Sequence, residues 1–465
     1  MTEMQQGRCV LPPDGSGRVL DRLAGLEKVI TPALVRQVLL ATNRVNQRAC
    51  KLPHEVMLWV VLAMGILTDL PIRQVFKHAR RLRMGEGAPH RSSLCVARQR
   101  LGIPPVRRLF QEVVHPLAKP DTPGGFYRGL RLMGIDGTVL NVPDSPANAK
   151  TFGRPSGGDR GDGAFPQVRK LSLVELGTHV EVTLQIKPCA CSEQAMLPPL
   201  LPYLTPDMLL IWDRNFFSYS LWKTLNSREI KVLARVKSTL ILEPIARRPD
   251  GSYLAKIYPS SSARQKDRDG IVVRVIKYTL DDPGRVGHGE VHRLLTNLLD
   301  ENLYPARELI CGYHDRWEHE LVFDEQKTHQ DPRRATKPAH LRSQTPAGVV
   351  QEMYALSLAH FVVRALMFEA AQREQLDPDR LSFTGCFHIL QCRLPECDSR
   401  TAQSFGEWCN SLLWELAQER TEPRRNRINP RVIKQKMSKW PKKRPEHRHP
   451  PPLTKTFAES TVMLR

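Results

Sequence analysis

No Cys-x-x-Cys pair occurs in the sequence, although ten cysteines are scattered over its 465 residues. Isolated cysteines are typical of reduced thiols in the cytosol and do not indicate a disulfide framework. The group Cys386, His388, Cys392 and Cys397 matches no common structural zinc site, so we interpret these cysteines as buried or incidental. The sequence also lacks an uncharged apolar run near ~18 residues and an N-terminal signal-peptide pattern. We therefore expect a cytoplasmic protein without a membrane partner.

Acidic residues are too few to balance the basic ones. The chain has 69 Lys and Arg against 48 Asp and Glu, which gives a formal net charge of +21. Such an excess predicts a polyanionic partner, but ribosomal and membrane-surface proteins share it, so charge alone does not choose among them. The apolar fraction of 41% is enough for real hydrophobic cores. One core rarely organises a chain of this length, so two to four domains are expected.

Four functional side chains recur at helical spacing close to one another. Tyr313, Arg316, Glu320 and Lys327 fall within a sector of roughly 60° on one face of a predicted helix, at ~100° per residue. These side chains suit a phosphodiester and its metal ion, because a carboxylate binds Mg²⁺ while a guanidinium, an ammonium and a phenol bind phosphate oxygens. The alternative is a solvated helix face with helical ion pairs.

Two aspartates lie upstream, each on a predicted strand. Residues 130–142 alternate like a half-buried strand, and Asp136 projects from it beside a glycine. The apolar run at 208–212 is typical of a buried strand, and Asp213 follows it at the lip of a sheet. An aspartate at a strand end is more often a helix cap or a turn residue. The order strand-Asp, strand-Asp, helix-Glu is much rarer, and it points to three carboxylates that act together.

Asp136, Asp213 and Glu320 can bind two Mg²⁺ ions, with Mn²⁺ able to substitute, which predicts phosphodiester cleavage and strand transfer. In these residues the sequence resembles the DDE transposases of bacterial insertion sequences, specifically the insertion sequence four family. That family is marked by Tyr, two residues, Arg, three residues, Glu, six residues, Lys, and this chain meets all four positions. The segments around Asp136 and Asp213 are similar to the two aspartate motifs of the same family. The resemblance covers residues 125–370.

The resemblance implies an RNase H-like catalytic domain, with a mixed five-stranded sheet flanked by helices. The strands at Asp136 and Asp213, a hairpin at 168–187 and a strand at 230–236 supply such a sheet. About a hundred residues separate Asp213 from Glu320, too many for one ordinary connection, so an insertion is expected there.

Two predicted strands, at 270–280 and 291–298, make the insertion β-rich. No tryptophan lies between Ser238 and Arg307. In some relatives an insertion tryptophan stacks on a flipped base, so the sequence does not predict that role here.

The fold class expected is α/β, with a helical N-terminal domain before the catalytic domain and a basic arm after it. The predicted parts are a helical DNA-binding domain at 1–120, the first part of the catalytic domain at 125–237, the β-rich insertion at 238–303, the second part of the catalytic domain at 304–375, and a C-terminal helical region with a basic tail at 376–465.

Two basic segments outside the catalytic region are candidates for DNA contact. Ser92 or Ser93 can cap a helix that displays Arg98 and Arg100, and this helix is either a recognition helix or a basic helix packed on the catalytic core. Residues 421–450 contain 11 Lys or Arg against two Glu, which predicts an extended arm with salt-dependent attraction to DNA.

We therefore expect a metal-dependent transposase that binds the terminal inverted repeats of its own element, cuts the ends and joins the 3′ hydroxyls to target DNA. Its partner is double-stranded DNA, and the family resemblance implies a homodimer on that DNA, in the cytoplasm on the nucleoid. Two alternatives remain. One is a catalytically inactive DNA-binding regulator, and the other is a general nuclease or junction resolvase.

Overall fold

The computed structural model describes residues 20–48, 50–82, 84, 87–156, 161–285, 287–314, 316–331, 341–397, 401–422 and 453–464. The chain divides into two compact units, each assembled from three separate segments. Unit 1 comprises residues 1–119, 137–200 and 319–421, and unit 2 comprises residues 120–136, 201–318 and 422–465. Each unit is therefore built from parts far apart in the sequence, and the strand that carries Asp136 contributes residues to both.

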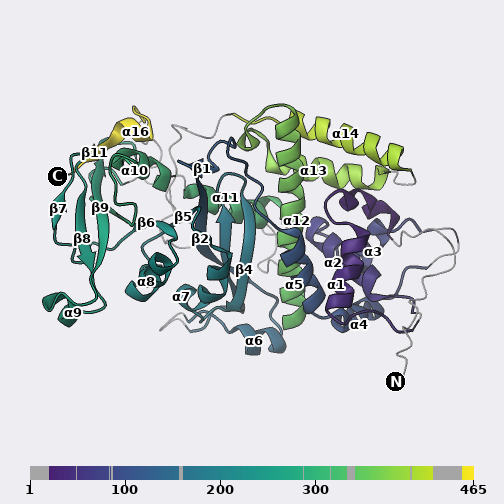
Figure 1. Ribbon diagram of the computed structural model, residues 1–465. Helices are drawn as coiled ribbons and strands as arrows, with labels where there is room; N and C mark the ends of the chain where they lie inside the picture. The colour runs from purple at the N-terminus through teal and green to yellow at the C-terminus, as the bar shows by residue number, and fades with distance from the viewer. Residues whose placement is uncertain are drawn as a thin grey trace, which may run out of the picture. The chain divides into compact units, whose positions relative to one another are not determined.

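Unit 1 is mostly helical and is organised around the long helix α12 (Pro346–Arg373), which packs against α2 (His54–Ile66) (Figure 1). Helix α2 is buried from Val56 to Ile66, so it is a core helix of this unit. A Cβ added at Gly65 would collide with the carbonyl of Ala355, so glycine permits the close approach of the two helices.

Unit 1 contains further helices. They are η1 (Asp21–Lys28), α1 (Pro32–Ala41), α3 (Ile72–Ala79), α4 (Arg91–Leu101), α5 (Pro104–Val113), α6 (Pro146–Phe152), α7 (Glu193–Met196), η6 (Pro378–Arg380), α13 (Phe383–Arg393), η7 (Leu394–Glu396) and α14 (Ala402–Gln418). By length and composition alone α12 could cross a membrane, but 83% of its most apolar window is buried inside the structure. Helix α12 is thus the core helix of this unit.

The sheet strands of unit 1 lie in the order β4-β3-β2. Strands β3 (Gln167–Glu175) and β4 (Val180–Pro188) pair antiparallel, which confirms the predicted hairpin. Strand β2 (Leu130–Asn141) enters unit 1 at Gly137. Side chains from β2, α6, β3 and α12 form a common apolar core, whose members include Leu140, Phe152, Val168, Val349 and Met353. This core fixes the sheet against α12.

Unit 2 holds strands in the order β2-β5-β6-β10-β9-β8-β7, with a short strand β1 (Phe126–Tyr127) pairing with β2 (Figure 1). Strand β5 (Met208–Trp212) is parallel to both β2 and β6 (Lys231–Arg235). Strand β10 (His292–Thr296) pairs antiparallel with β6. The strands predicted for the insertion therefore continue this sheet directly beyond β6.

The outer strands of unit 2 are β9 (Ile271–Leu280), β8 (Tyr253–Ile257) and β7 (Ala246–Arg247), and its helices include α8 (Tyr219–Ser227) and α9 (Ser261–Gln265). Helix α8 begins at its cap Ser218, whose side chain accepts from the Leu221 amide. The chain passes from unit 1 into unit 2 within the 3₁₀ helix η3 (Pro198–Tyr203).

The single helix predicted over Tyr313 to Lys327 is wrong, because the segment is three elements. Helix α10 (Ala306–His314) belongs to unit 2, α11 (Trp317–Asp324) follows, and η4 (Glu325–His329) is a π-helical turn. The Arg316 amide donates to the Tyr313 carbonyl at 3.2 Å, and the Gln330 amide donates to the Glu325 carbonyl at 2.7 Å. Each departure from α-helical winding rotates the following side chains, so the common 60° face does not persist.

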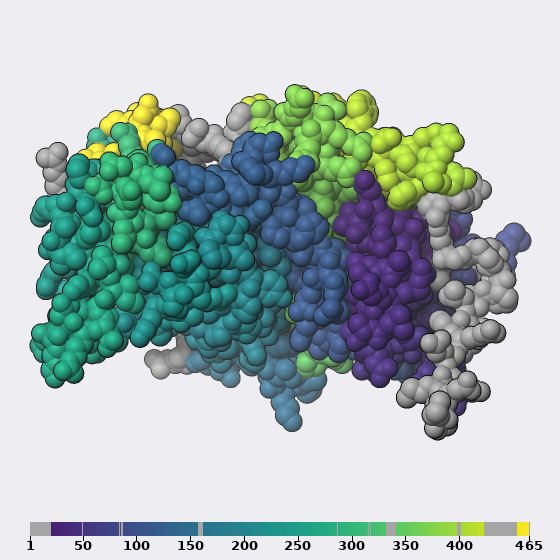
Figure 2. Space-filling model, in the orientation of Figure 1, coloured from purple at the N-terminus to yellow at the C-terminus, as the bar shows by residue number. Residues whose placement is uncertain are grey.

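The last described residues return to unit 2. Helix α16 (Phe457–Ser460) lies against α10, and β11 (Thr461–Met463) pairs antiparallel with β9 (Figures 1 and 2, yellow). The Phe457 ring stacks on His314 with 3.9 Å between centroids. Helices α13 and α14 lie in the predicted C-terminal helical region, whereas residues 423–452 of the predicted basic arm lie outside the described residues.

Candidate active site

Asp136 and Asp213 occupy equivalent positions on adjacent parallel strands of unit 2. The register of β2 and β5 pairs Gly134 with Ile211 and Ile135 with Trp212, and each aspartate is the next residue on its strand. Neighbouring strands lie ~4.8 Å apart, so the two carboxylates leave the sheet close together. Both aspartates are half-buried. The sequence prediction that these aspartates share one site is consistent with this register.

Two residues of the Tyr-Arg-Glu-Lys motif lie beside these acids in unit 2. The Arg316 guanidinium forms an ion pair with the Asp136 carboxylate, with 3.6 Å between Nη1 and Oδ2. Burial raises the pKa of Tyr313 above its usual range; Arg316 lowers it and Asp213 raises it. The phenol therefore keeps its proton at neutral pH and remains a hydrogen-bond donor.

The other two motif residues, Glu320 and Lys327, belong to unit 1. Glu320 is half-buried on α11. The Lys327 ammonium donates to Thr138 Oγ1 and, at 3.3 Å, to the Val139 carbonyl. Both acceptors follow Asp136 on strand β2. The motif is thus tied to one strand at two points, through Arg316 in unit 2 and through Lys327 in unit 1.

Sequence reasoning missed Glu325, a buried carboxylate two residues before Lys327. Arg364 Nε donates to Glu325 Oε2 at 3.1 Å, and Arg364 Nη2 donates to Oε1. His360 Nε2 lies 2.9 Å from Oε2, and His179 Nδ1 lies 3.2 Å from Oε1. We call these four residues the Glu325 cluster. The signal in the sequence was a glutamate on the apolar side of the helix, and its partners were not readable because they lie on distant segments.

Charge interactions inside the Glu325 cluster decide its protonation. Burial by itself raises the pKa of Glu325, but Arg364 and then His179 lower it well below the usual range. Burial lowers the pKa of His360, and its contact with Glu325 only partly offsets this. Glu325 is therefore an anion and His360 is neutral at pH 7, so the cluster holds the π-turn through one buried ion pair and two histidine contacts.

A second buried pair lies next to the cluster, beneath the same turn. Lys170 Nζ and Glu181 Oε1 are 2.7 Å apart on neighbouring strands, and Gln326 Nε2 donates to Glu181 Oε2 at 3.2 Å. Burial raises the pKa of Glu181, but Lys170 outweighs it and brings the pKa to about 2. Glu325 and Gln326 therefore anchor the π-turn to α12 and to the β3–β4 hairpin at once, immediately before Lys327.

The predicted recognition helix is α4, but Arg98 does not face solvent. Its side chain is buried, with Nε donating to Gln351 Oε1 at 2.9 Å and Nη2 donating to the Gly348 carbonyl at 2.6 Å. These contacts join α4 to the start of α12, so Arg98 has a packing role. Arg100, two residues further on, is exposed.

Substitution separates these two arginines. Arg98→Ala leaves Gln351 and Gly348 without their charged donor, and we expect it to cost about 2 kcal/mol of stability. Arg100→Ala is expected to leave stability unchanged. Urea unfolding followed by tryptophan fluorescence measures both effects, and equal midpoints for Arg98→Ala and Arg100→Ala would contradict the packing role.

Two carboxylates on adjacent parallel strands, beside an arginine and a protonated phenol, are typical of a metal-dependent enzyme that acts on phosphodiesters. Carboxylate oxygens are the ligands that divalent cations such as Mg²⁺ accept, so the donor set fits the metal that this chemistry requires.

Comparison with known proteins identifies the family. Residues 20–111 match the N-terminal domain of insertion element 4 transposases, and residues 128–362 match the transposase DDE domain. Transposase InsG for insertion sequence element IS4 of Escherichia coli is 28% identical over 428 residues, which cover 90% of this chain and 93% of InsG. InsZ, a candidate transposase of the same organism, is 26% identical over 200 residues, 42% of this chain and 64% of InsZ.

A solved synaptic complex of piggyBac transposase with hairpin DNA aligns over 85% of each chain, with a TM-score of 0.42 and 10% identity. The family match alone covers half of the chain, and the chain belongs to the DDE transposases of the insertion element 4 family. It is a DNA transposase with an RNase H-like catalytic fold, an enzyme of DNA cleavage and strand transfer that depends on a divalent metal.

Proposed function

We propose that Asp136, Asp213 and Glu320 are the three catalytic carboxylates of this transposase and that they bind two Mg²⁺ ions, with Mn²⁺ able to substitute. The observation that carries the proposal is the register of β2 and β5, which puts Asp136 and Asp213 at equivalent positions on adjacent strands. Glu320 enters through its place in the motif, four residues after Arg316. When bound, the two ions activate a water or hydroxyl nucleophile and stabilise the leaving 3′ oxygen.

The remaining motif residues position the DNA backbone in this proposal. Arg316 lies beside Asp136, and its planar guanidinium matches the geometry of phosphate oxygens. Tyr313 donates its phenolic proton, and Lys327 supplies a positive charge beside strand β2. Loss of any of the three should reduce the cleavage rate with less effect on metal binding.

We further propose that the substrate is the element's own pair of terminal inverted repeats, followed by target DNA. Two ends must be cut together, so a homodimer on DNA is expected, with one protomer at each end. Arg100, exposed on α4, is a candidate contact with these repeats. The site of action is the cytoplasm, on the nucleoid. A monomer crosslinked to both cut ends would contradict the dimer.

The test is cleavage of a labelled duplex that carries the DNA end flanking the coding region. We expect cutting at that end with Mg²⁺ and none with EDTA, because the leaving oxygen needs the metal charge. Glu320→Gln should bind the duplex without cutting it, and strand transfer at the wild-type rate would show that Glu320 is not a catalytic residue.

Two other outcomes reject the proposed function. Tight, salt-sensitive binding that Mg²⁺ does not convert into cleavage indicates an inactive regulator. Cutting that is equally fast on a duplex of scrambled end sequence indicates a general nuclease. The scrambled duplex of equal length and composition is therefore the matched control in each assay.

A further inference from the structure

The row of residues that contains both aspartates continues onto a third strand, where it ends in an arginine. Strands β5 and β6 are parallel, with Trp212 paired to Ala234, so Arg235 stands in the same row as Asp213. At ~4.8 Å per strand, the Arg235 backbone lies about 5 Å from that of Asp213 and about 10 Å from that of Asp136. The cation is thus one strand beyond the carboxylate pair.

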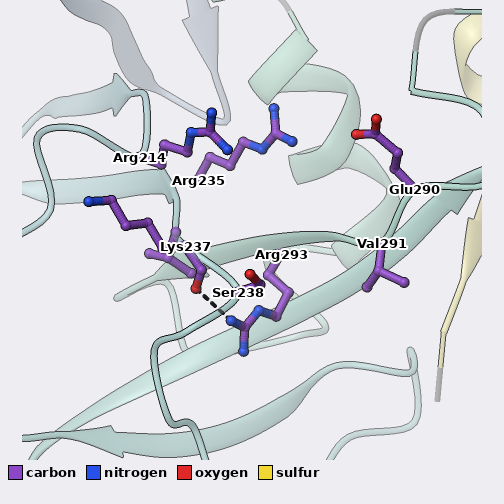
Figure 3. A pocket seen from close by; sticks show the side chains of 8 residues that line it. Arg214, Arg235, Lys237, Ser238, Glu290, Val291 and Arg293 are labelled. Atoms are coloured by element: carbon purple, nitrogen blue, oxygen red, sulfur yellow. Dashed lines mark hydrogen bonds between the residues drawn. The ribbon is translucent and has the colours of Figure 1, made fainter.

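Arg235 lines a pocket of about 300 Å³ in unit 2 (Figure 3). Arg214, Lys237 and Arg293 also line it, together with Ser238 and Glu290. Figure 3 shows Arg214 and Arg235 extending in the same direction, with Lys237 and Arg293 on other sides of the pocket. The lining holds four cations and one carboxylate, so the pocket has a strong positive charge and suits an anion rather than an apolar ligand.

Hydrogen bonds between side chains and the backbone support the wall of the pocket. The Arg293 guanidinium donates to the Lys237 carbonyl at 2.5 Å and to the Leu240 carbonyl at 3.0 Å, which fixes the turn after β6. The Arg214 amide donates to Asp213 Oδ1 at 2.7 Å, so the residue that lines the pocket also orients the aspartate. The pocket therefore lies next to Asp213, at the end of strand β5.

Solvent exposure separates the lining cations by role. Arg214 and Lys237 are exposed, whereas Arg235 and Arg293 are half-buried. Arg293 donates hydrogen bonds to two backbone carbonyls, so it mainly supports the pocket wall. Arg214, Arg235 and Lys237 are left to bind an incoming anion. Three cations around a space of this size match one phosphate group with its oxygens facing several donors.

We propose that this pocket binds a backbone phosphate of the DNA strand that neighbours the scissile phosphate, and that Lys237 and Arg214 are the residues that grip it. The proposal rests on the proposed function, since the scissile phosphate is the one at Asp136 and Asp213. The strand then crosses the edge of the sheet from β2 towards β10, and the Glu290 carboxylate repels phosphate from the far rim.

The experiment combines a protein substitution with a substitution in the DNA. Labelled end duplexes each carry one neutral methylphosphonate, placed in turn at each position around the cut site. Affinity is measured by fluorescence anisotropy in Ca²⁺, over a series of KCl concentrations. With the wild-type protein, one position adjacent to the cut should weaken binding. With Lys237→Gln that penalty should disappear, and the slope of log K against log salt should fall by about 1.

Lys266→Gln is the matched control, because Lys266 is an exposed lysine of unit 2 that does not line the pocket. It should keep both the penalty and the slope of the wild-type protein. Arg214→Gln is a second pocket variant and should behave like Lys237→Gln. If the methylphosphonate weakens DNA binding equally in wild type, Lys237→Gln and Arg214→Gln, the proposed phosphate site is wrong.

The pocket is tested by DNA affinity and the proposed function by DNA cleavage, so the two proposals can be rejected independently. If the wild-type protein cuts the end with Mg²⁺ but the pocket variants keep the wild-type penalty, the pocket proposal alone is rejected. If the wild-type protein does not cut, the proposed function is rejected. Loss of the penalty in Lys237→Gln then still supports a phosphate site in the pocket.

Discussion

Asp213→Asn is expected to reduce end cleavage by at least about 10³-fold, equivalent to about 4 kcal/mol of transition-state stabilisation. An asparagine keeps the size of the side chain and one oxygen, but it removes the negative charge that a divalent ion needs. DNA affinity should stay equal or rise, because a negative charge is lost beside the phosphate. Single-turnover cleavage and anisotropy, measured on the same duplex, separate the two effects.

Asp207→Asn is the matched control for this variant. Asp207 is exposed and lies immediately before β5, at the opposite end of the strand that Asp213 follows. Each substitution removes one negative charge next to β5, but at opposite ends of the strand. Equal cleavage by wild type and Asp207→Asn is expected, and an equal loss in both variants would assign the effect to folding or net charge.

Local sequence patterns were sufficient to predict the strands that carry the two aspartates. Strand β5 is a short apolar run that ends at a polar residue, and β2 alternates, so length and period both favour strands at Asp136 and Asp213. The family resemblance implied only a mixed five-stranded sheet. Its exact register, which sets Arg235 beside Asp213, depends on backbone pairing that no local pattern encodes.

The helix of the motif was predicted as continuous because periodicity describes one segment at a time. Tertiary contacts interrupt this helix. Arg316 pairs with Asp136 in unit 2, whereas Glu325 and Gln326 form hydrogen bonds with side chains of unit 1. Arg98 was misplaced for a related reason. Its acceptor Gln351 lies 253 residues away, and only the tertiary fold distinguishes a buried arginine from one on the surface.

Arg364→Met is expected to destabilise the protein by about 3–5 kcal/mol at pH 7, because it removes the guanidinium of a buried ion pair and leaves the Glu325 charge uncompensated. Arg373→Met is the matched control on the same helix. Arg373 pairs with Glu369 at 3.0 Å, but Arg373 is exposed and Glu369 is only half-buried, so a change of well under ~1 kcal/mol is expected. Urea midpoints of the two variants measure the difference.

The pH dependence of the stability loss in Arg364→Met tests whether the buried Glu325 charge causes that loss. The folded-state pKa of Glu325 is depressed, so its stabilisation is complete above the unfolded pKa, about 4.3, and is lost as the pH falls. In Arg364→Met the buried carboxyl prefers its proton, so its folded-state pKa rises. The difference in the free energy of unfolding between wild type and Arg364→Met should therefore become smaller from pH 7 to pH 5. A deficit that stays constant over this range would point to lost packing instead.

A double variant completes the argument. Glu325→Gln in the Arg364→Met background removes the stranded charge, so it should recover part of the lost stability and abolish the narrowing with pH. Lys327 lies in the same turn, two residues after Glu325, and contacts Thr138 two residues beyond Asp136. If the Glu325 cluster positions Lys327 in addition to stabilising the fold, Glu325→Gln alone should cut DNA more slowly at a temperature where it is fully folded. If folded Glu325→Gln cuts DNA at the wild-type rate, the Glu325 cluster contributes to stability alone and does not position Lys327.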